Sequence, residues 1–351
     1  MARSSGQKPG QEPEQEPGQG PGQPSPQPPP LGFTWADYLQ AVIAVEGTLT
    51  AVAWKLVSAG GPEDVASIER ALRRLRERGQ RDGGAWGQRL LRAFPVPRAV
   101  EERLRWMGLY HSPFSDLPLE LCIDQLRLWD RPPLSESRAR VWLQLGHAST
   151  ALRQRAFDAA AAALLRAAAV QSPPEAARIE LALARAYLES RTGTSEGVAR
   201  QLDLAERELQ EAPPDALSAE DRACFGARLV DQRAFQLNRA GEHAAALALY
   251  RSLPESDAHP FASYRRDAGL AYGCLRTGLR DEALRYARRA CDHAGDGGYT
   301  RLRVMALILS ARVEGLPAAA ATLQRAEAIA GRLGDLELIA RVARVRLGRS
   351  E

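Results

Sequence analysis

The chain has 351 residues, of which 45% are hydrophobic, and it carries a formal net charge of +4 with an isoelectric point near 9.0. Alanine, leucine, arginine and glutamate are abundant and favour helices, whereas the alternating β-branched runs typical of strands are almost absent. This composition excludes a β-rich protein and predicts an all-α fold, and the charge permits an acidic partner without requiring one.

Residues 1–32 are low-complexity sequence. Glutamine recurs at every fourth position from Gln7 to Gln27, and nine prolines lie between Pro9 and Pro30. Because such a segment has too few apolar side chains to offset the entropy of ordering, we predict a disordered tail with polyproline-like character. A solubilising spacer is the plain interpretation, and a PxxP ligand for a partner is the alternative.

Residues 33–130 have the pattern of four or five helices that form an N-terminal module. Thr34 is the predicted N-cap of the first helix, with Asp37 three positions later as an imperfect capping box, and Gly47 interrupts the apolar pattern that follows. Two prolines in the sequence 131–133 end the module, and Ser135 is predicted to cap the next helix. The predicted helices are 35–57, 64–78, 86–94, 97–107 and 117–129.

Three glycines, Gly241, Gly278 and Gly315, stand 37 residues apart, each between two stretches of helical pattern. Each begins a similar phrase, and the three phrases read GEHAAAL, GLRDEAL and GLPAAAA. A self-similar period in this range is typical of stacked helix pairs, because one pair cannot bury its apolar face alone. From residue 135 onward we predict about five hairpins, followed by an amphipathic helix at 336–347 that would cover the exposed end.

The first of these hairpins opens with Trp142, Leu145 and Gly146 in the form W-x-x-L-G, and residues 135–351 resemble the tetratricopeptide-repeat (TPR) family. The resemblance implies a right-handed α-solenoid, although the period of 37 exceeds the family's usual value of about 34. A related helical-hairpin repeat and an ordinary alanine-rich bundle stay open as alternatives. The small residues at positions where the family brings two helices into close contact are Gly146, Ala184, Ala234 and Ala271.

In that family the first helix of each unit lines a concave groove. Guanidinium groups suit carboxylates and phosphates, and aromatic side chains suit a peptide anchor, so we expect a scaffold or adaptor that binds an acidic protein or peptide. The competing interpretation is that these arginines pair with neighbouring acids and leave the groove solvated. The candidate partner-binding residues implied by the resemblance are Arg140, His147, Arg178, Arg185, Arg228, Asp231, Phe235, Asn238, Arg239, Arg265, Tyr272 and Arg276.

Catalytic and metal-binding patterns are missing from the sequence. It has no phosphate-binding loop, nucleophile elbow or HExxH motif, and none of its five histidines pairs with another at metal spacing. The four cysteines have no short paired spacing, which indicates buried free thiols. No apolar run is long enough to cross a bilayer, and no signal-peptide pattern is present. We therefore expect a cytoplasmic, non-enzymatic protein without metal or cofactor, and its arginine-rich, lysine-poor composition is typical of a high-GC bacterial genome.

A DNA-binding transcriptional regulator is the alternative function. The short helices predicted between residues 64 and 107 have the spacing of a helix-turn-helix, and Arg98, Arg103 and Arg105 would face phosphates, with the repeats as a sensory or oligomerisation domain. Prolines in the second turn and the lack of polar base-reading side chains on the last helix oppose this interpretation. A cap or docking domain for the repeats is the other interpretation of the module, and self-association is left open.

Overall fold

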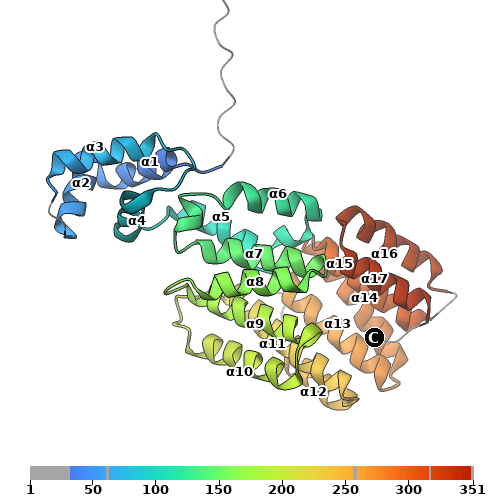
Figure 1. Ribbon diagram of the computed structural model, residues 1–351. Coiled ribbons are helices and arrows are strands. Elements are labelled where there is room, and N and C mark those ends of the chain that lie inside the picture. The colour runs from blue at the N-terminus through green and yellow to red at the C-terminus, as the bar shows by residue number, and fades with distance from the viewer. Residues whose placement is uncertain (1–31, 61–62, 256–258, 316–317, 349–351) are drawn as a thin grey trace, which may run out of the picture. The chain divides into compact units, whose positions relative to one another are not determined.

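The computed structural model describes residues 32–60, 63–255, 259–315 and 318–348 (Figure 1). The predicted disordered tail, residues 1–32, lies outside the described residues except for Gly32. Within these ranges every regular element is a helix, namely seventeen α-helices and two short 3-10 helices, and no strand is present. The predicted all-α fold class is therefore confirmed.

The helices follow one another with short connections. Those before residue 137 are α1 (Trp35–Glu46), α2 (Leu49–Ser58), α3 (Val65–Arg76), α4 (Gly84–Ala93), α5 (Arg98–Gly108), η1 (Pro113–Asp116), α6 (Leu119–Trp129) and η2 (Leu134–Glu136). Those after it are α7 (Arg140–Arg153), α8 (Phe157–Ala168), α9 (Glu175–Thr192), α10 (Ser195–Glu211), α11 (Ala219–Arg239), α12 (His243–Ser252), α13 (Pro260–Arg276), α14 (Arg280–Asp296), α15 (Thr300–Glu314), α16 (Ala320–Leu333) and α17 (Leu336–Arg346).

Local sequence signals set several of the helix ends. The Thr34 hydroxyl accepts from the Asp37 N–H, and the Asp37 carboxylate accepts from the Thr34 N–H, so the predicted capping box is present. Gly47 ends α1 with a φ of 89°, which divides the predicted helix 35–57 in two. The predicted cap at Ser135 is wrong: this residue lies inside η2, and α7 begins only at Arg140.

The three glycines of the 37-residue period share a positive φ. The φ angles of Gly241, Gly278 and Gly315 are 84°, 83° and 81°. A side chain at such a φ would clash with its own backbone, so glycine is favoured where the chain leaves one helix and turns toward the next. Their recurrence in the sequence therefore marks three places where the chain leaves a helix with a positive φ.

Helices α7 to α16 pack as five consecutive pairs, and the pairs contact one another in chain order (Figure 1). The first helix of each pair contacts the first helix of the next, as α9 does with α7 and α11. The second helix of each pair contacts the next first helix, as α8 does with α9. Helix α17 packs on α15 and α16, where the sequence predicts a helix that covers the last hairpin.

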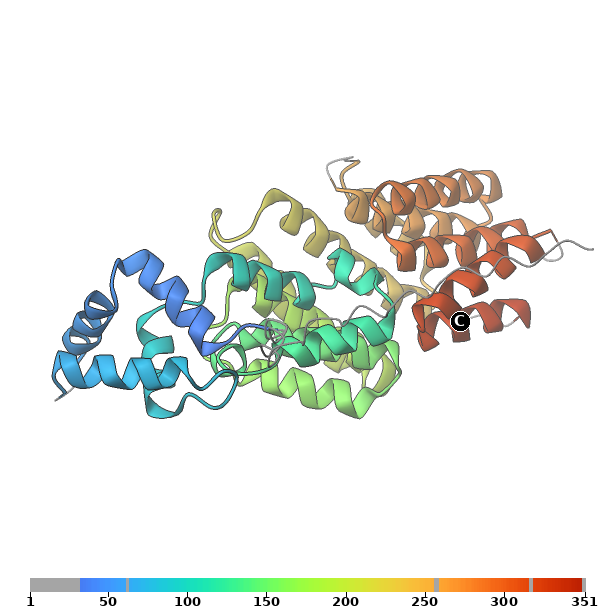
Figure 2. The ribbon, with the colours of Figure 1, turned by 90° about the horizontal axis from the view of Figure 1, so that it is seen from above.

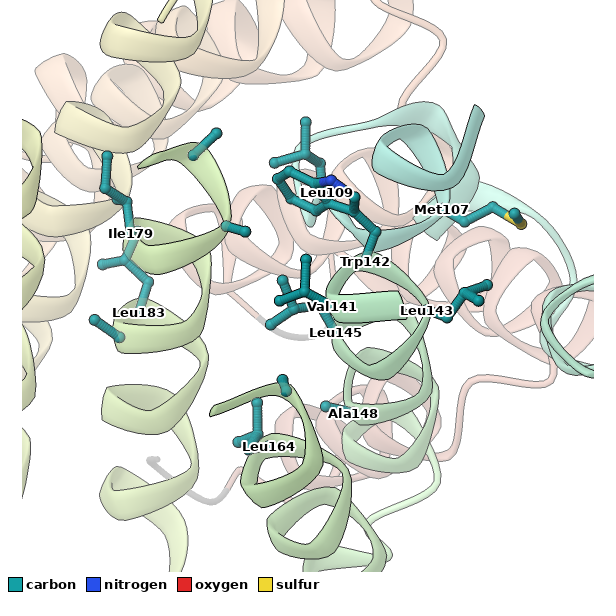
Figure 3. Packing of buried hydrophobic residues seen from close by; sticks show 14 of the residues in the cluster. Met107, Leu109, Val141, Trp142, Leu143, Leu145, Ala148, Leu164, Ile179 and Leu183 are labelled. Atoms are coloured by element: carbon teal, nitrogen blue, oxygen red, sulfur yellow. The ribbon is translucent and has the colours of Figure 1, made fainter. Parts of the chain in front are cut away.

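The hydrophobic core divides at a different place from the predicted boundary at residues 131–135. Side chains of α5 and α6 share one buried cluster with α7 to α11. Met107, Leu109 and Trp142 all belong to this cluster, and Leu109 is drawn at the Trp142 ring in Figure 3. Helices α1 to α4 have a separate cluster. A Cβ added at Gly108 would lie 2.5 Å from the Trp142 carbonyl oxygen, and one at Gly146 would lie 2.9 Å from that of Met107. These two glycines therefore allow α5 to pack tightly against α7.

Candidate partner-binding surface

Two arginines expected in the groove are buried in ion pairs. The Arg228 guanidinium on α11 donates to both carboxylate oxygens of Glu180 on α9, at 2.6 and 2.8 Å, and the two side chains are only 6% and 4% exposed. On α13, Arg265 donates to Asp231 of α11 at 2.7 Å and is 9% exposed. Arg228 and Arg265 thus follow the competing interpretation, in which arginines pair with neighbouring acids and are not available to a partner.

Tyr110, in the turn between α5 and η1, lies among the same charged groups. Its hydroxyl accepts from Arg265 at 3.1 Å, and its N–H donates to Glu180 at 3.3 Å. Its ring lies 4.8 to 5.7 Å from the guanidinium carbons of Arg228, Arg265 and Arg301. Burial acts to raise the pKa of the Tyr110 phenol, but these three cations outweigh it and lower the pKa. Through its side chain and its backbone N–H, Tyr110 therefore links α9, α11, α13 and α15.

Residues 109–116, which comprise this turn and η1, are called the Tyr110 segment. Neighbours of Tyr110 in the sequence hold this segment in place. The His111 imidazole donates to Asp221 on α11 at 3.2 Å, and the His111 carbonyl accepts from the Tyr299 hydroxyl at 3.2 Å. The Asp116 carboxylate accepts from the Arg301 N–H at 2.6 Å, and burial raises the pKa of Asp116 to about 6. Side chains and backbone of the Tyr110 segment thus occupy the face of the first helices on which a groove is expected.

A second buried contact joins the first hairpin to the last. Asp335, just before α17, accepts from Arg153 of α7 at 3.2 Å and from Arg301 of α15 at 2.7 Å. The Asp335 side chain is 0% exposed and that of Arg153 is 2% exposed. Nearby, Glu337 pairs with Arg191 of α9 at 3.1 Å. The ends of α7 and α9 are therefore tied directly to the turn between α16 and α17.

Four other expected groove residues lie apart from one another. His147 donates to Asp130 at 3.1 Å, and Arg178 pairs with Glu208 at 2.6 Å, so both are engaged within the chain. Arg140 and Arg185 are half-buried. None of the four belongs to the group of residues that the structure gathers at the ends of α11 and α13.

That group consists of five expected residues and one that the sequence did not single out. Arg265 of α13 donates to Asp231 of α11, and Arg276 at the end of α13 contacts His243, the first residue of α12, which also lies against Asn238 of α11. Tyr272 lies one helical turn before Arg276 on α13. We name the group the arginine–aromatic patch, and its members are Phe235, Asn238, Arg239, His243, Tyr272 and Arg276.

Neutral groups orient the two arginines of this patch. His243 Nδ1 lies 2.9 Å from the Asn238 side-chain oxygen, and His243 Nε2 accepts from Arg276 at 2.9 Å. A neutral imidazole that carries its proton on Nδ1 makes both hydrogen bonds. Arg239 stacks on the Phe235 ring at 6.0 Å and donates to a backbone carbonyl. Both arginines are exposed, and no ion pair of the described residues includes either one. Their charges are therefore open to a carboxylate from outside the chain.

Sequence reasoning missed the Tyr110 segment and the role of His243. Residues 109–116 lie between two predicted helices and carry no helical period, and a local pattern does not report which distant helices such a connection will contact. His243 is the third residue of the repeated phrase GEHAAAL, so its place beside the glycine turn is visible in the sequence. Its contact with Arg276 depends on the packing of α12 against α13.

The arginines proposed to face phosphates on the third helix of the helix-turn-helix each have a partner within the chain, although the Arg98 and Arg103 side chains lie at the surface. Arg105 pairs with Asp221, Arg98 pairs with Glu102 at 2.8 Å, and Arg103 stacks on the Trp129 ring at 4.5 Å. In addition, α4 and α5 contribute to different hydrophobic clusters. Helix α5 therefore belongs with the repeat helices in its packing, and it does not complete a three-helix unit with α3 and α4.

One cysteine and one histidine lie in contact, a pairing that the sequence did not suggest. Cys224 Sγ is 3.3 Å from His259 Nδ1, but burial raises the pKa of the thiol to about 12 and lowers that of the imidazole. A thiol with such a pKa stays protonated at neutral pH and is a poor nucleophile. Cys122, Cys224 and Cys274 are buried and free, as predicted, while Cys291 is half-buried and free.

Among the described residues, no three His, Cys, Asp or Glu side chains are grouped so that they could hold a metal ion. No single described helix has the length and apolar character needed to span a membrane, and only the pair α1 and α2, bent by 86°, passes that test jointly. Comparison of the sequence with protein-family models and with curated proteins finds no match.

Proposed function

We propose that this protein is a non-enzymatic scaffold that binds a protein or peptide partner through the arginine–aromatic patch. In this proposal α7 to α16 form a right-handed, TPR-like α-solenoid of five hairpins, and α17 covers its last hairpin. The order of helix contacts supports it, because each first helix contacts both its own partner helix and the next first helix. The setting we propose is a bacterial cytoplasm, with no cofactor.

The observation that carries the proposal is the environment of Arg239 and Arg276. Both side chains are exposed and are oriented by neutral partners. Arg239 stacks on the half-buried Phe235 ring, and half-buried Tyr272 lies one helical turn before Arg276 on α13. Guanidinium forks bind carboxylates in two-point contacts, and half-buried aromatic rings are frequent anchors of protein interfaces. The partner that fits is an acidic segment with an apolar side chain, or a chain end with its free carboxylate.

The Tyr110 segment supports the same function from inside the protein. By joining α9, α11, α13 and α15 it holds the helices that carry the patch in one arrangement. A surface that is already ordered loses little conformational entropy when a partner binds, which favours affinity. In this proposal the Tyr110 segment is a structural brace, and the partner binds on the exposed ends of α11 and α13.

A peptide selection tests the proposal. Random peptides with free C-termini are displayed and selected on the full chain, and enriched peptides are then titrated against variants by fluorescence anisotropy. Arg239→Glu combined with Arg276→Glu should weaken binding by at least roughly tenfold, because a carboxylate then meets like charge. Arg285→Glu combined with Arg288→Glu, two exposed arginines of α14, makes the same charge change elsewhere and should leave binding unchanged.

The composition of the selected peptides and the response of the aromatic residues complete the test. Enriched peptides should carry Asp or Glu next to an apolar residue. Phe235→Ala should weaken the binding of these peptides by about 1–2 kcal/mol. The proposal is wrong if selection enriches no acidic residues, or if the patch variant and the α14 control bind the selected peptides equally well.

A further inference from the structure

A second charged surface lies on α3 and the turn that follows it. Between residues 69 and 82 the chain has six arginines and three acidic residues, and all six arginines are exposed. Among the ion pairs between described residues, only Arg73 of this set has a carboxylate partner, which is Glu69 at 2.9 Å. The six are Arg70, Arg73, Arg74, Arg76, Arg78 and Arg81. This surface thus concentrates positive charge that the chain itself leaves largely uncompensated.

The helical period of α3 separates these arginines from its core face. Ile68, Leu72 and Leu75 are buried against neighbouring helices, so the arginines point outward. Ser67, Arg70, Arg73 and Arg74 line a surface hollow of about 480 Å³. A second hollow of about 300 Å³ includes Arg74 and Arg78 in its lining. The two hollows share Arg74.

A compact set of helices holds α3 in place. Helices α1, α2 and α3 contact one another in all three pairings, and Figures 1 and 2 both show them side by side. Fully buried Trp35 of α1 donates from its indole to the Arg81 carbonyl at 2.8 Å, which ties the turn after α3 to the same core. The three-helix unit that presents the arginines is therefore α1 to α3, which differs from the predicted helix-turn-helix.

We propose that the exposed face of α3 binds double-stranded DNA. With 12 residues, α3 is about 18 Å long, and an α-helix fits the major groove of B-form DNA, which is about 12 Å wide. Arginines placed along such a helix reach the phosphates on both sides of the groove. This binding is a second activity, and it does not depend on the proposed partner at the arginine–aromatic patch.

The side chains of the face favour DNA over other polyanions. An interface for an acidic protein has a buried core rich in aromatic and apolar residues, whereas the outward positions of α3 carry arginine, serine and glutamate. Duplex RNA has a deep, narrow major groove that does not admit a helix. B-form DNA is the polyanion whose groove accepts both the charge and the shape of α3.

Fluorescence anisotropy with a labelled DNA duplex of roughly 20 base pairs, titrated with the full chain at increasing salt, tests the proposal. With about four phosphate contacts, a plot of log K against log salt concentration should have a slope of about −3 to −4. Arg70→Gln combined with Arg74→Gln and Arg76→Gln should weaken binding on the order of 100-fold at low salt and reduce the slope by about 2–3.

The matched control removes three exposed arginines elsewhere, Arg285, Arg288 and Arg332, each changed to Gln, and should bind like wild type. Because all six substituted side chains are exposed, both triple variants should keep the wild-type far-UV circular dichroism and melting temperature. Duplex RNA of the same sequence and a poly-glutamate peptide serve as competitors. Binding that is lost only in the α3 variant, and that duplex DNA competes best, is the expected result. The proposal is overturned if DNA does not bind at low salt, if both triple variants bind alike, or if RNA or poly-glutamate competes as well as DNA.

Discussion

Replacing Asp335 with asparagine removes one negative charge from the buried contact that joins α7, α15 and the start of α17. Asparagine has nearly the same shape, and it keeps the oxygen that accepts from the Leu338 N–H and caps α17. What is lost is the charge that faces Arg153 and Arg301, at 3.2 and 2.7 Å, in a site with 0% exposure of the carboxylate. Uncompensated buried charge of this kind lowers the free energy of unfolding by about 3–5 kcal/mol. Asp335→Ala also removes the cap and should cost about 1 kcal/mol more.

Urea denaturation followed by far-UV circular dichroism at neutral pH measures these differences. Burial acts to raise the pKa of Asp335, but Arg301 and Arg153 outweigh it, so the pKa lies below its ordinary value of 3.8. The stabilisation from the Asp335 charge is then fully present at pH values above the pKa that Asp335 has in the unfolded chain. It is lost as the pH falls through the lower pKa that Asp335 has in the folded protein. The gap between wild type and Asp335→Asn should therefore narrow in acid. A gap below about 1 kcal/mol at neutral pH, or one that does not change in acid, would refute the reasoning.

Three other substitutions test separate parts of the fold. Tyr110→Phe removes the hydroxyl that accepts from Arg265 and should cost about 1.5–3 kcal/mol in urea denaturation, and no loss would show that this contact is dispensable. Gly278→Ala places a side chain at a φ of 83° and should lower stability by about 1–2 kcal/mol, whereas an unchanged melting temperature would contradict the role of the glycine. Asp116 has a pKa raised to about 6 by burial, so its contribution is full below 3.8 and is lost as the pH rises through 6. Between pH 4 and 7 the free energy of unfolding of the wild type should fall by on the order of 2–3 kcal/mol relative to that of Asp116→Asn. If the two proteins show the same dependence of unfolding free energy on pH, Asp116 does not have a raised pKa.

Short-range chemistry explains what the sequence predicts well. The capping box at Thr34, the turn glycines such as Gly241, and the last amphipathic helix depend on neighbours within a few residues, and each has its expected counterpart in the structure. The hairpin order follows from the same signals, because a glycine turn between two apolar stripes leaves the two helices antiparallel. The prediction that Ser135 caps the next helix rested on a single position, and it is wrong because the chain forms the 3-10 helix η2 there before α7 begins.

Long-range contacts set the limit of sequence prediction for the site. Arg228 occupies the outward stripe of its own hairpin, and it becomes buried only because Glu180 of the preceding hairpin and Tyr110 of a distant turn cover that stripe. Nothing within a few residues of Arg228 distinguishes it from Arg239, which lies three turns further along α11 and is exposed. The same argument applies to α5, whose packing on α7 depends on the missing side chain of Gly108.

We propose above all that a protein partner binds at the arginine–aromatic patch. A capture experiment from nuclease-treated lysate of the native host, with wild type, the Arg239→Glu and Arg276→Glu double variant and the Arg285→Glu and Arg288→Glu control, tests it directly. We expect one set of proteins to be retained by wild type and by the control and to be lost with the patch variant, since only that variant reverses charge beside Phe235 and Tyr272. Proteins retained equally by all three chains, or lost from all three after nuclease treatment, would contradict it.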